Sequence, residues 1–159
     1  MSVAQKVIHL QNPEETAQFA EMIGETLVPG DCLLLEGPIG AGKTHFARHL
    51  IQSLQNPPED VPSPTFTLVQ TYETTVGELW HADLYRLTTL DEIEELGLAD
   101  AFETAICLVE WPDRLADLAP STALRLTFES DPTSETKRTL SCAWSDPKWS
   151  SKLEQIENV

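Results

Sequence analysis

Positively charged residues are scarce in this sequence, and their scarcity limits what the protein binds. The 159 residues include 10 lysines and arginines against 26 aspartates and glutamates, so the formal net charge is -16. Such a surface repels the phosphate backbone of nucleic acids, and we expect any contact with tRNA to be indirect. The same charge favours a protein partner with a basic face, because opposite potentials steer association.

Cysteines and long apolar runs are also few. The three cysteines, Cys32, Cys107 and Cys142, lie far apart in apolar segments and form no Cys-x-x-Cys spacing. We therefore expect buried, reduced thiols, which are typical of a reducing compartment. The N-terminus lacks the apolar stretch of a signal peptide, and no run is long enough to span a membrane. These features predict a cytoplasmic protein without a membrane partner.

Short apolar strands alternate with amphipathic helical segments, which predicts an α/β fold. The apolar runs 32–37 and 105–111 predict buried strands, and the apolar spacing after Lys43 predicts a helix. A helix-start signature at Asn12 predicts a helix that ends near Leu27. The other expected elements are a strand at 6–10, a strand hairpin at 65–73 and 78–87, a helix at 89–97, a short helix from Pro112, and a late antiparallel pair at 123–128 and 139–144.

This pattern predicts the overall architecture. We expect one domain over residues 1–159, with a core of the P-loop NTPase type at 31–118 and a hairpin and tail at 119–159. The central sheet is expected to be mixed, with a parallel core, antiparallel hairpins, and helices on both faces.

The clearest chemical motif follows the buried strand at 32–37. Gly37, Gly42, Lys43 and Thr44 give the pattern G-x-x-x-x-G-K-T, a phosphate-binding loop. Glycines let backbone amides turn toward a phosphate, and the helix N-terminus adds positive potential. We expect Lys43 to contact the β- and γ-phosphates and the Thr44 hydroxyl to bind Mg²⁺. The predicted nucleotide-binding residues are Gly37, Pro38, Ile39, Gly40, Ala41, Gly42, Lys43, Thr44 and His45.

The identity of the nucleotide follows from a motif that the sequence lacks. GTPases of this class read guanine with an [NT]-K-x-D stretch, and the nearest match, Glu135–Arg138, has no aspartate. ATP is therefore favoured. His45 and His49 are spaced for a helical zinc motif, but no glutamate follows His45 and the pair lies on the phosphate-loop helix, so no zinc is expected.

Acids and a switch residue are needed to complete such a site. Glu110 ends a buried strand and Asp83 lies in "HADLYR", so both are candidates to hold Mg²⁺ or to orient the attacking water. Thr65, in "SPTF", occupies the place of the first GTPase switch loop and is our candidate γ-phosphate sensor. Simpler alternatives are a surface acid at Glu110, an Asp83 paired with Arg86 or His81, and a plain connector around Thr65.

Five blocks, in this order, carry a family resemblance: "GAGKT", "SPTFTLVQTYE", "HADLYRL", "DEIEELGLADAF" and "ICLVEWPDRL". They resemble the TsaE (YjeE) family of small bacterial ATPases, over residues 33–115. The resemblance implies an ATPase that acts in making the threonylcarbamoyl modification of the tRNA adenosine next to the anticodon. It also implies TsaB and TsaD as partners, in a complex that the ATPase binds and resets.

The resemblance also assigns roles by position. Lys43 and Thr44 match the family's phosphate and Mg²⁺ residues. The switch segment is matched by Ser63 and Thr65, the acid of H-x-D-x-Y-R by Asp83, and the V-E-W block by Glu110 and Trp111. Pro38 and His45 depart from the residues that members often carry there. A small-molecule or nucleoside kinase and a nucleotide sensor without turnover remain the two rival functions.

Overall fold

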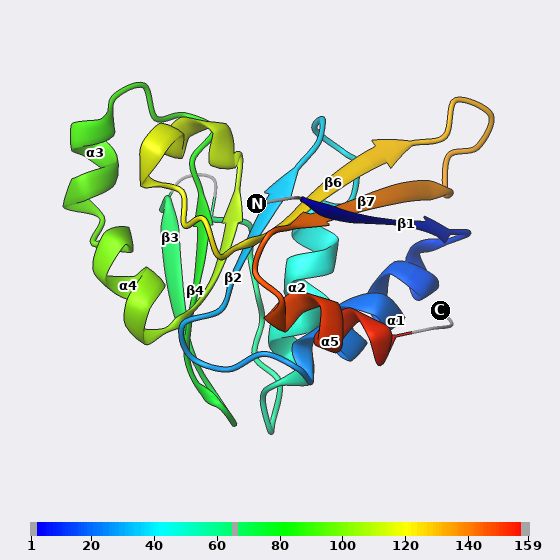
Figure 1. Cartoon of the computed structure of the whole chain (residues 1–159), viewed down its shortest axis with the longest axis horizontal. Helices are drawn as coiled ribbons and strands as arrows, with labels where there is room; N and C mark the ends of the chain where they lie inside the picture. The colour runs from blue at the N-terminus through cyan, green and yellow to red at the C-terminus, as the bar shows by residue number, and fades with distance from the viewer. Residues whose placement is uncertain (1–2, 65–66, 157–159) are drawn as a thin grey trace.

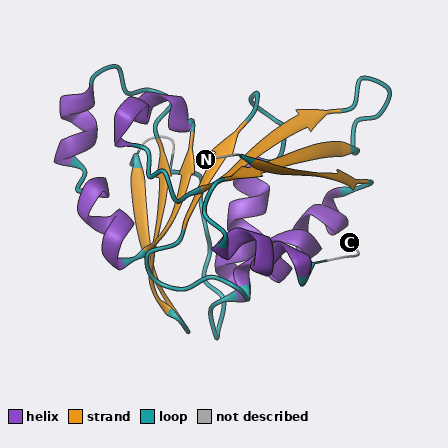
Figure 2. Cartoon of the chain, viewed as in Figure 1, coloured by secondary structure: helices purple, strands orange, loops and turns teal. Residues whose placement is uncertain are grey.

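The computed structural model describes residues 3–64 and 67–156 (Figure 1). Strands and helices alternate along most of the chain, which confirms the predicted α/β class (Figure 2). In chain order the elements are β1 (Ala4–Leu10), α1 (Pro13–Gly24), β2 (Cys32–Glu36), α2 (Lys43–Ser53), β3 (Val69–Thr74), β4 (Gly77–Asp83), α3 (Leu90–Glu95), α4 (Leu98–Thr104), β5 (Ile106–Glu110), the 3₁₀ helix η1 (Pro112–Leu118), β6 (Leu124–Ser130), β7 (Arg138–Trp144) and α5 (Lys148–Glu154).

All seven strands of the described chain belong to one sheet, in which the N-terminal strand β1 pairs with the C-terminal strand β7. Its order is β1-β7-β6-β2-β5-β4-β3. The strand pairs β2–β5, β2–β6 and β4–β5 are parallel, whereas β1–β7, β6–β7 and β3–β4 are antiparallel. The predicted mixed sheet is therefore confirmed, and the late pair β6–β7 extends it on the side of β2 opposite β5.

Two apolar layers pack on opposite faces of this sheet, as the helix positions in Figure 1 show. Helices α1, α2 and α5 bury residues such as Phe19, Phe46 and Trp149 against one face. Helices α3, α4 and η1 cover the other face, where Leu98 and Leu115 are buried. Strand β2 supplies side chains to both layers, which explains why its sequence is continuously apolar instead of alternating.

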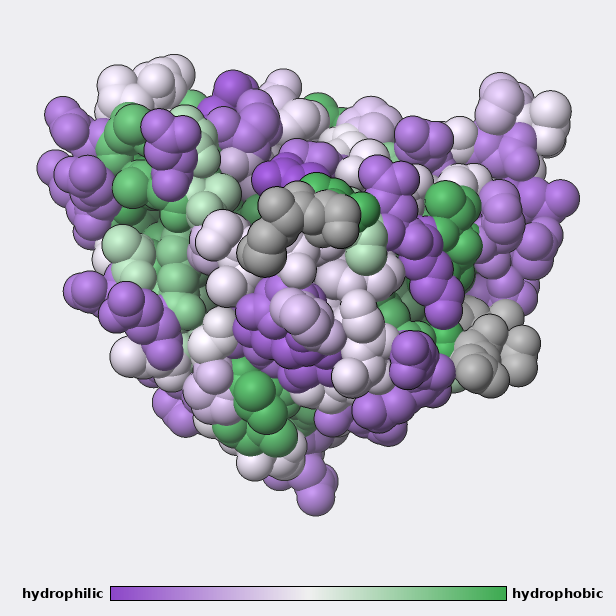
Figure 3. All heavy atoms as spheres, viewed as in Figure 1, coloured by the Kyte–Doolittle hydropathy of each residue, from purple (hydrophilic) through white to green (hydrophobic). Residues whose placement is uncertain are grey.

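The surface matches the composition. On the face drawn in Figure 3, hydrophilic side chains predominate and hydrophobic ones form separate areas. All three cysteines are free and buried, as predicted. No helix within the described ranges is long and apolar enough to cross a lipid bilayer.

Three predicted boundaries differ from the structure by three residues or more, each because of the local backbone. Strand β4 ends at Asp83, not at Leu87, because the chain turns and the Leu87 amide bonds the Leu84 carbonyl at 3.0 Å. Helix α1 ends at Gly24, where the Leu27 amide closes a turn onto the Gly24 carbonyl at 3.1 Å.

The third boundary concerns the predicted hairpin. Strand β3 begins at Val69, because Leu68 adopts a left-handed conformation with a φ of 68° that interrupts the strand. Residues 65–66 lie outside the described part of the chain. Gly97 ends α3 as expected, but its left-handed backbone also starts α4, a helix that the pattern did not predict.

A buried carboxylate fastens the C-terminal helix to the start of β2. Asp31 is 2% exposed and accepts hydrogen bonds from Lys148 Nζ at 2.8 Å and Lys152 Nζ at 2.6 Å. Burial raises the pKa of Asp31, but the hydrogen bonds from Lys148 and Lys152 outweigh burial, so the pKa lies below its ordinary value. Helix α5 is thus held by charge as well as by the burial of Trp149.

Replacing Asp31 with asparagine is expected to lower the free energy of unfolding by about 2 kcal/mol at neutral pH, since two lysines lose their charged acceptor. The folded-state pKa lies below the unfolded one, so this stabilisation is complete above the unfolded pKa and is lost as the pH falls through the folded pKa. Urea unfolding of the parent and Asp31→Asn from about pH 7 to about pH 2 measures the difference. A difference that does not shrink in acid contradicts the prediction; exposed Asp117→Asn is the control.

Candidate functional site

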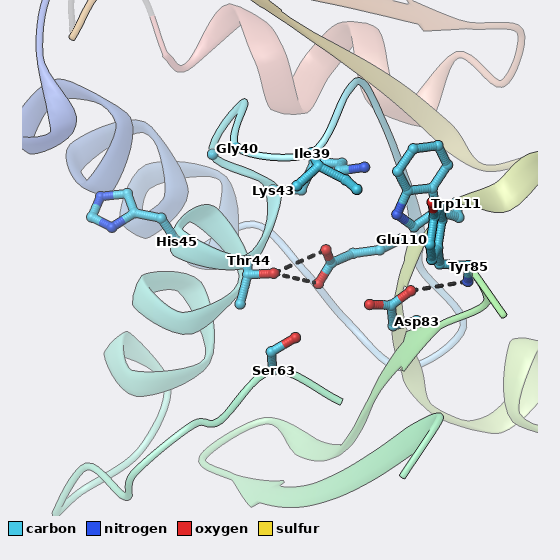
Figure 4. Close-up of a pocket in the computed structure, with 11 residues that line it drawn as sticks. Ile39, Gly40, Lys43, Thr44, His45, Ser63, Asp83, Tyr85, Glu110 and Trp111 are labelled. Atoms are coloured by element: carbon cyan, nitrogen blue, oxygen red, sulfur yellow. Dashed lines mark hydrogen bonds between the residues drawn. The ribbon is translucent and has the colours of Figure 1, made fainter. Parts of the chain in front are cut away.

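A pocket of about 530 Å³ opens where the glycine-rich loop, β4 and β5 meet (Figure 4). The loop joins β2 to α2, and β2 lies between parallel neighbours that come from different parts of the chain, β5 and β6. Crevices at the carboxyl ends of such strands are where α/β sheets bind ligands. The lining residues are Ile39, Gly40, Gly42, Lys43, Thr44, His45, Ser63, Asp83, Tyr85, Glu110 and Trp111.

The backbone conformation explains why glycine occupies two positions of the loop, Gly37 and Gly42. Gly37 has a φ of 139°, and a Cβ at this position would lie 2.5 Å from the carbonyl oxygen of Phe128. Gly42 has a φ of 107° and forms the N-cap of α2. Because other residues rarely adopt these conformations, both positions require glycine, and the loop passes close to β6 before it enters α2.

Lys43 is held in place by the groups around its ammonium. It is 4% exposed, its Nζ donates to the Gly37 carbonyl at 2.5 Å, and the Trp111 ring centroid lies 3.6 Å from the same atom. Burial lowers the pKa of Lys43, and the carboxylates of Glu110 and Asp83 offset part of this effect. The ammonium of Lys43 therefore lies between the loop backbone and two acids. Loops of this kind bind a charged phosphate at this lysine.

Glu110 is a buried acid and not a surface acid, which rules out the simpler alternative. It is 2% exposed, and the Thr44 hydroxyl donates to its two carboxylate oxygens at 3.0 and 3.1 Å. On its other side, His81 Nε2 lies 2.7 Å from Oε2 and, because a carboxylate only accepts, donates to it. His81 is fully buried, and its Nδ1 has no hydrogen-bond partner among the described residues.

Asp83 lies beside Glu110, because the two residues are register partners on the parallel strands β4 and β5. It is 6% exposed, and its Oδ1 accepts a hydrogen bond from the Tyr85 amide at 3.0 Å. The alternative that paired Asp83 with His81 is wrong, since His81 bonds Glu110. Two carboxylates thus end neighbouring strands, and Figure 4 shows Glu110 directly beside Thr44.

Aromatic rings close one side of the pocket. Trp111 adopts a left-handed backbone with a φ of 59°, so its ring leaves the strand direction and lies over Lys43. The Tyr85 ring packs against it with centroids 4.8 Å apart. Residue patterns did not single out Tyr85 or the His81–Glu110 contact. The period of two along β4, which places His81 and Asp83 on one face, was the available signal.

The remaining predicted residues divide into several groups. Ser63 lines the pocket, whereas Thr65 lies outside the described residues. Pro38 and Ala41 shape the loop through a 3.2 Å hydrogen bond from the Ala41 amide to the Pro38 carbonyl, and they do not line the pocket. His45 lies at the rim, and Figure 4 shows its ring apart from the carboxylates; its Nε2 is 3.1 Å from the Pro13 carbonyl.

The donor set of the pocket fits a hard cation. Thr44, Glu110 and Asp83 offer only oxygen atoms, the ligands that Mg²⁺ prefers. In the described ranges no group of three or more histidine, cysteine, aspartate or glutamate side chains is placed to hold a metal alone. Mg²⁺ typically combines one or two protein ligands with waters and phosphate oxygens, so this set suits a metal that arrives with a nucleotide.

The mixed sheet and the glycine-rich loop between a parallel strand and a helix define an α/β protein of the P-loop NTPase type. A family model, "Threonylcarbamoyl adenosine biosynthesis protein TsaE", matches residues 10–140. The chain belongs to the TsaE family.

Individual relatives agree with the family model. The tRNA threonylcarbamoyladenosine biosynthesis protein TsaE of Bacillus subtilis is 40% identical over 119 residues, 74% of this chain and 73% of the relative. The TsaE of Aquifex aeolicus is 41% identical over 110 residues, 69% of this chain and 78% of the relative. The crystal structure of Bacillus subtilis YdiB superimposes with a TM-score of 0.76 at 28% identity and covers 98% of this chain and 96% of that chain.

Proposed function

We propose that this protein binds Mg·ATP and hydrolyses it, and that hydrolysis resets the complex that installs threonylcarbamoyl on the tRNA adenosine next to the anticodon. The observation that carries the proposal is the contact of Thr44 with buried Glu110 beneath the loop, with Lys43 beside them. An ammonium, a hydroxyl and a carboxylate are the groups with which P-loop NTPases hold phosphates and metal, and their proximity here supports the proposal.

Each residue has a distinct part in this proposal. Lys43, already desolvated, stabilises charge that develops on the β- and γ-phosphates. Thr44 and Glu110 would hold Mg²⁺, which would neutralise part of the phosphate charge. Asp83, on the neighbouring strand, faces the same space and orients the attacking water. Thr65 remains the proposed γ-phosphate sensor, and Ser63, two positions earlier in the sequence, lines the pocket.

The proposed partners are TsaB and TsaD, through which tRNA would be contacted indirectly. The relatives are named for tRNA threonylcarbamoyladenosine biosynthesis, which supports a role in that process. The charge of -16 disfavours direct tRNA binding and suits a basic protein face. Ile39 is 75% exposed and Tyr85 is 43% exposed, and both line the pocket. A partner protein that docks over the proposed nucleotide site would bury these apolar side chains. Buried free thiols support a cytoplasmic location.

ATP hydrolysis measured with and without purified TsaB and TsaD tests this function. We expect slow phosphate release by the protein alone and a rate at least about tenfold higher with the pair, because the partner excludes water and completes an open site. GTP in place of ATP is expected to be the poorer substrate. A protein that binds no ATP, and whose rate the pair leaves unchanged, contradicts the proposal.

The rival functions are judged by the same assay. Kinases usually clamp the transferred phosphoryl group with several arginines, but here Arg114 bonds the Tyr85 carbonyl and Arg125 pairs with Glu36. Phosphoryl transfer to a small molecule faster than to water would favour a kinase. Nucleotide-dependent partner binding without phosphate release would favour a sensor.

A further inference from the structure

The outer side of the phosphate loop is held by an arginine from the far end of the chain. Arg138, the first residue of β7, donates from Nε to the Ala41 carbonyl at 3.1 Å and from Nη2 to the Gly40 carbonyl at 3.3 Å. Its Nη1 donates to the carbonyls of Glu135 and Lys137 at 3.0 and 2.8 Å. One guanidinium therefore joins the β6–β7 connection to the loop.

The arginine itself is firmly anchored. Its backbone sits in the sheet, with Leu10 of β1 as register partner on one side and Ser130 of β6 on the other. The connection that it bonds is also tied to the segment before α1, since the Thr136 hydroxyl lies 3.4 Å from the Gln11 carbonyl. A planar guanidinium with five donors in a fixed fork suits this set of four carbonyls, whereas a lysine ammonium does not.

Because Arg138 fixes the Ala41 carbonyl, it also fixes the amide of the same peptide group, that of Gly42. In a trans peptide the C=O and N–H groups point in opposite directions, so the Ala41 carbonyl on Arg138 directs the Gly42 amide away from Arg138. Gly42 lines the pocket and caps α2. Nothing lies within 4 Å of the place where a Cβ of Gly40 or Gly42 would be, so side-chain packing does not restrain the loop at these positions.

We propose that Arg138 is a positioning residue that pre-organises the phosphate loop for nucleotide binding; the proposal rests on the proposed nucleotide site. Without Arg138 the glycine-rich loop samples other conformations, and part of the binding energy is spent on ordering it. Affinity for the nucleotide then falls, while turnover at saturating nucleotide is retained, because the filled loop is ordered by its ligand. The β6–β7 strand pair thereby has a role at the site.

Binding and hydrogen exchange of Arg138→Ala, Arg138→Lys and Lys137→Ala test this role. For Arg138→Ala we expect the Kd for Mg·ADP, measured by calorimetry, to rise about tenfold, equivalent to about 1.4 kcal/mol. Amides of residues 37–44 should exchange faster in the nucleotide-free variant. The kcat for ATP with the TsaB–TsaD pair should stay within about twofold of the parent. Arg138→Lys keeps the charge and loses the fork, so it should resemble Arg138→Ala.

Lys137→Ala is the matched control, because it removes one positive charge from an exposed neighbouring residue. The Kd of Lys137→Ala for Mg·ADP and the amide exchange rates of its residues 37–44 should equal those of the parent. Arg138→Ala with parental affinity, or with parental exchange in residues 37–44, overturns the role of Arg138 and leaves the ATPase proposal standing. If Arg138→Ala fails to fold, parental affinity in Arg138→Lys overturns it equally. A parent protein that binds no Mg·ADP overturns the proposed function and this role together.

Discussion

Lys43→Ala is expected to reduce ATP hydrolysis by about a hundredfold to a thousandfold, whether the protein is alone or with its partners. The side chain is 4% exposed, and its ammonium lies at the Gly37 carbonyl and over the Trp111 ring. The side chain is largely removed from solvent before a phosphate enters, so its charge interacts more strongly there than at the surface. Alanine removes this charge and opens the loop. Phosphate release at saturating ATP measures the effect.

Two further measurements test whether the loss of hydrolysis comes from the lost contact between Lys43 and the phosphates. Calorimetry with Mg·ADP should show weaker binding by Lys43→Ala, because the ammonium contacts the β-phosphate as well. Lys137→Ala, which removes an exposed lysine, should hydrolyse ATP like the parent. A thermal melt separates lost activity from lost folding. Parental hydrolysis by a folded Lys43→Ala would mean that the loop does not hold the reacting phosphates.

The features that sequence reasoning captured are those encoded locally. Strand β2 and the start of α2 follow from a continuous apolar run, a glycine motif and a helical period within residues 32–54. Glu110 was identifiable because it directly ends a second buried run. The loop, its lysine and both acids line one pocket, and their roles stay predictions.

The features that it missed depend on distant contacts. The pairing of β6 beside β2 joins residues about ninety positions apart, and no local pattern specifies that register. No sequence pattern points to Arg138 as a loop contact, because its acceptors are backbone carbonyls of Gly40 and Ala41, which any sequence would offer. The left-handed turn at Trp111 is likewise set by its surroundings, since tryptophan has no preference for it.

Glu110→Gln is the second substitution with a large expected effect. Glutamine keeps the shape of the side chain and an oxygen that accepts from Thr44, but it loses the negative charge. We expect turnover with the TsaB–TsaD pair to fall about a hundredfold, and the Mg²⁺ concentration that gives half-maximal rate to rise. Binding of ADP without Mg²⁺ should stay near that of the parent, because the charge is directed at the metal and not at the phosphate. Steady-state rates over a Mg²⁺ titration measure both effects.

Asp83→Asn is the matched comparison, because the two carboxylates are register partners and differ in what they touch. Glu110 accepts from the proposed Mg²⁺ residue Thr44, whereas Asp83 accepts from the Tyr85 amide, a bond that an asparagine oxygen can keep. We therefore expect Asp83→Asn to lower kcat without changing the Mg²⁺ requirement. The reverse pattern, with the Mg²⁺ requirement raised only in Asp83→Asn, would exchange the two roles. Full activity in both variants would remove the acids from the chemistry and leave them as structural partners of Thr44, His81 and Tyr85.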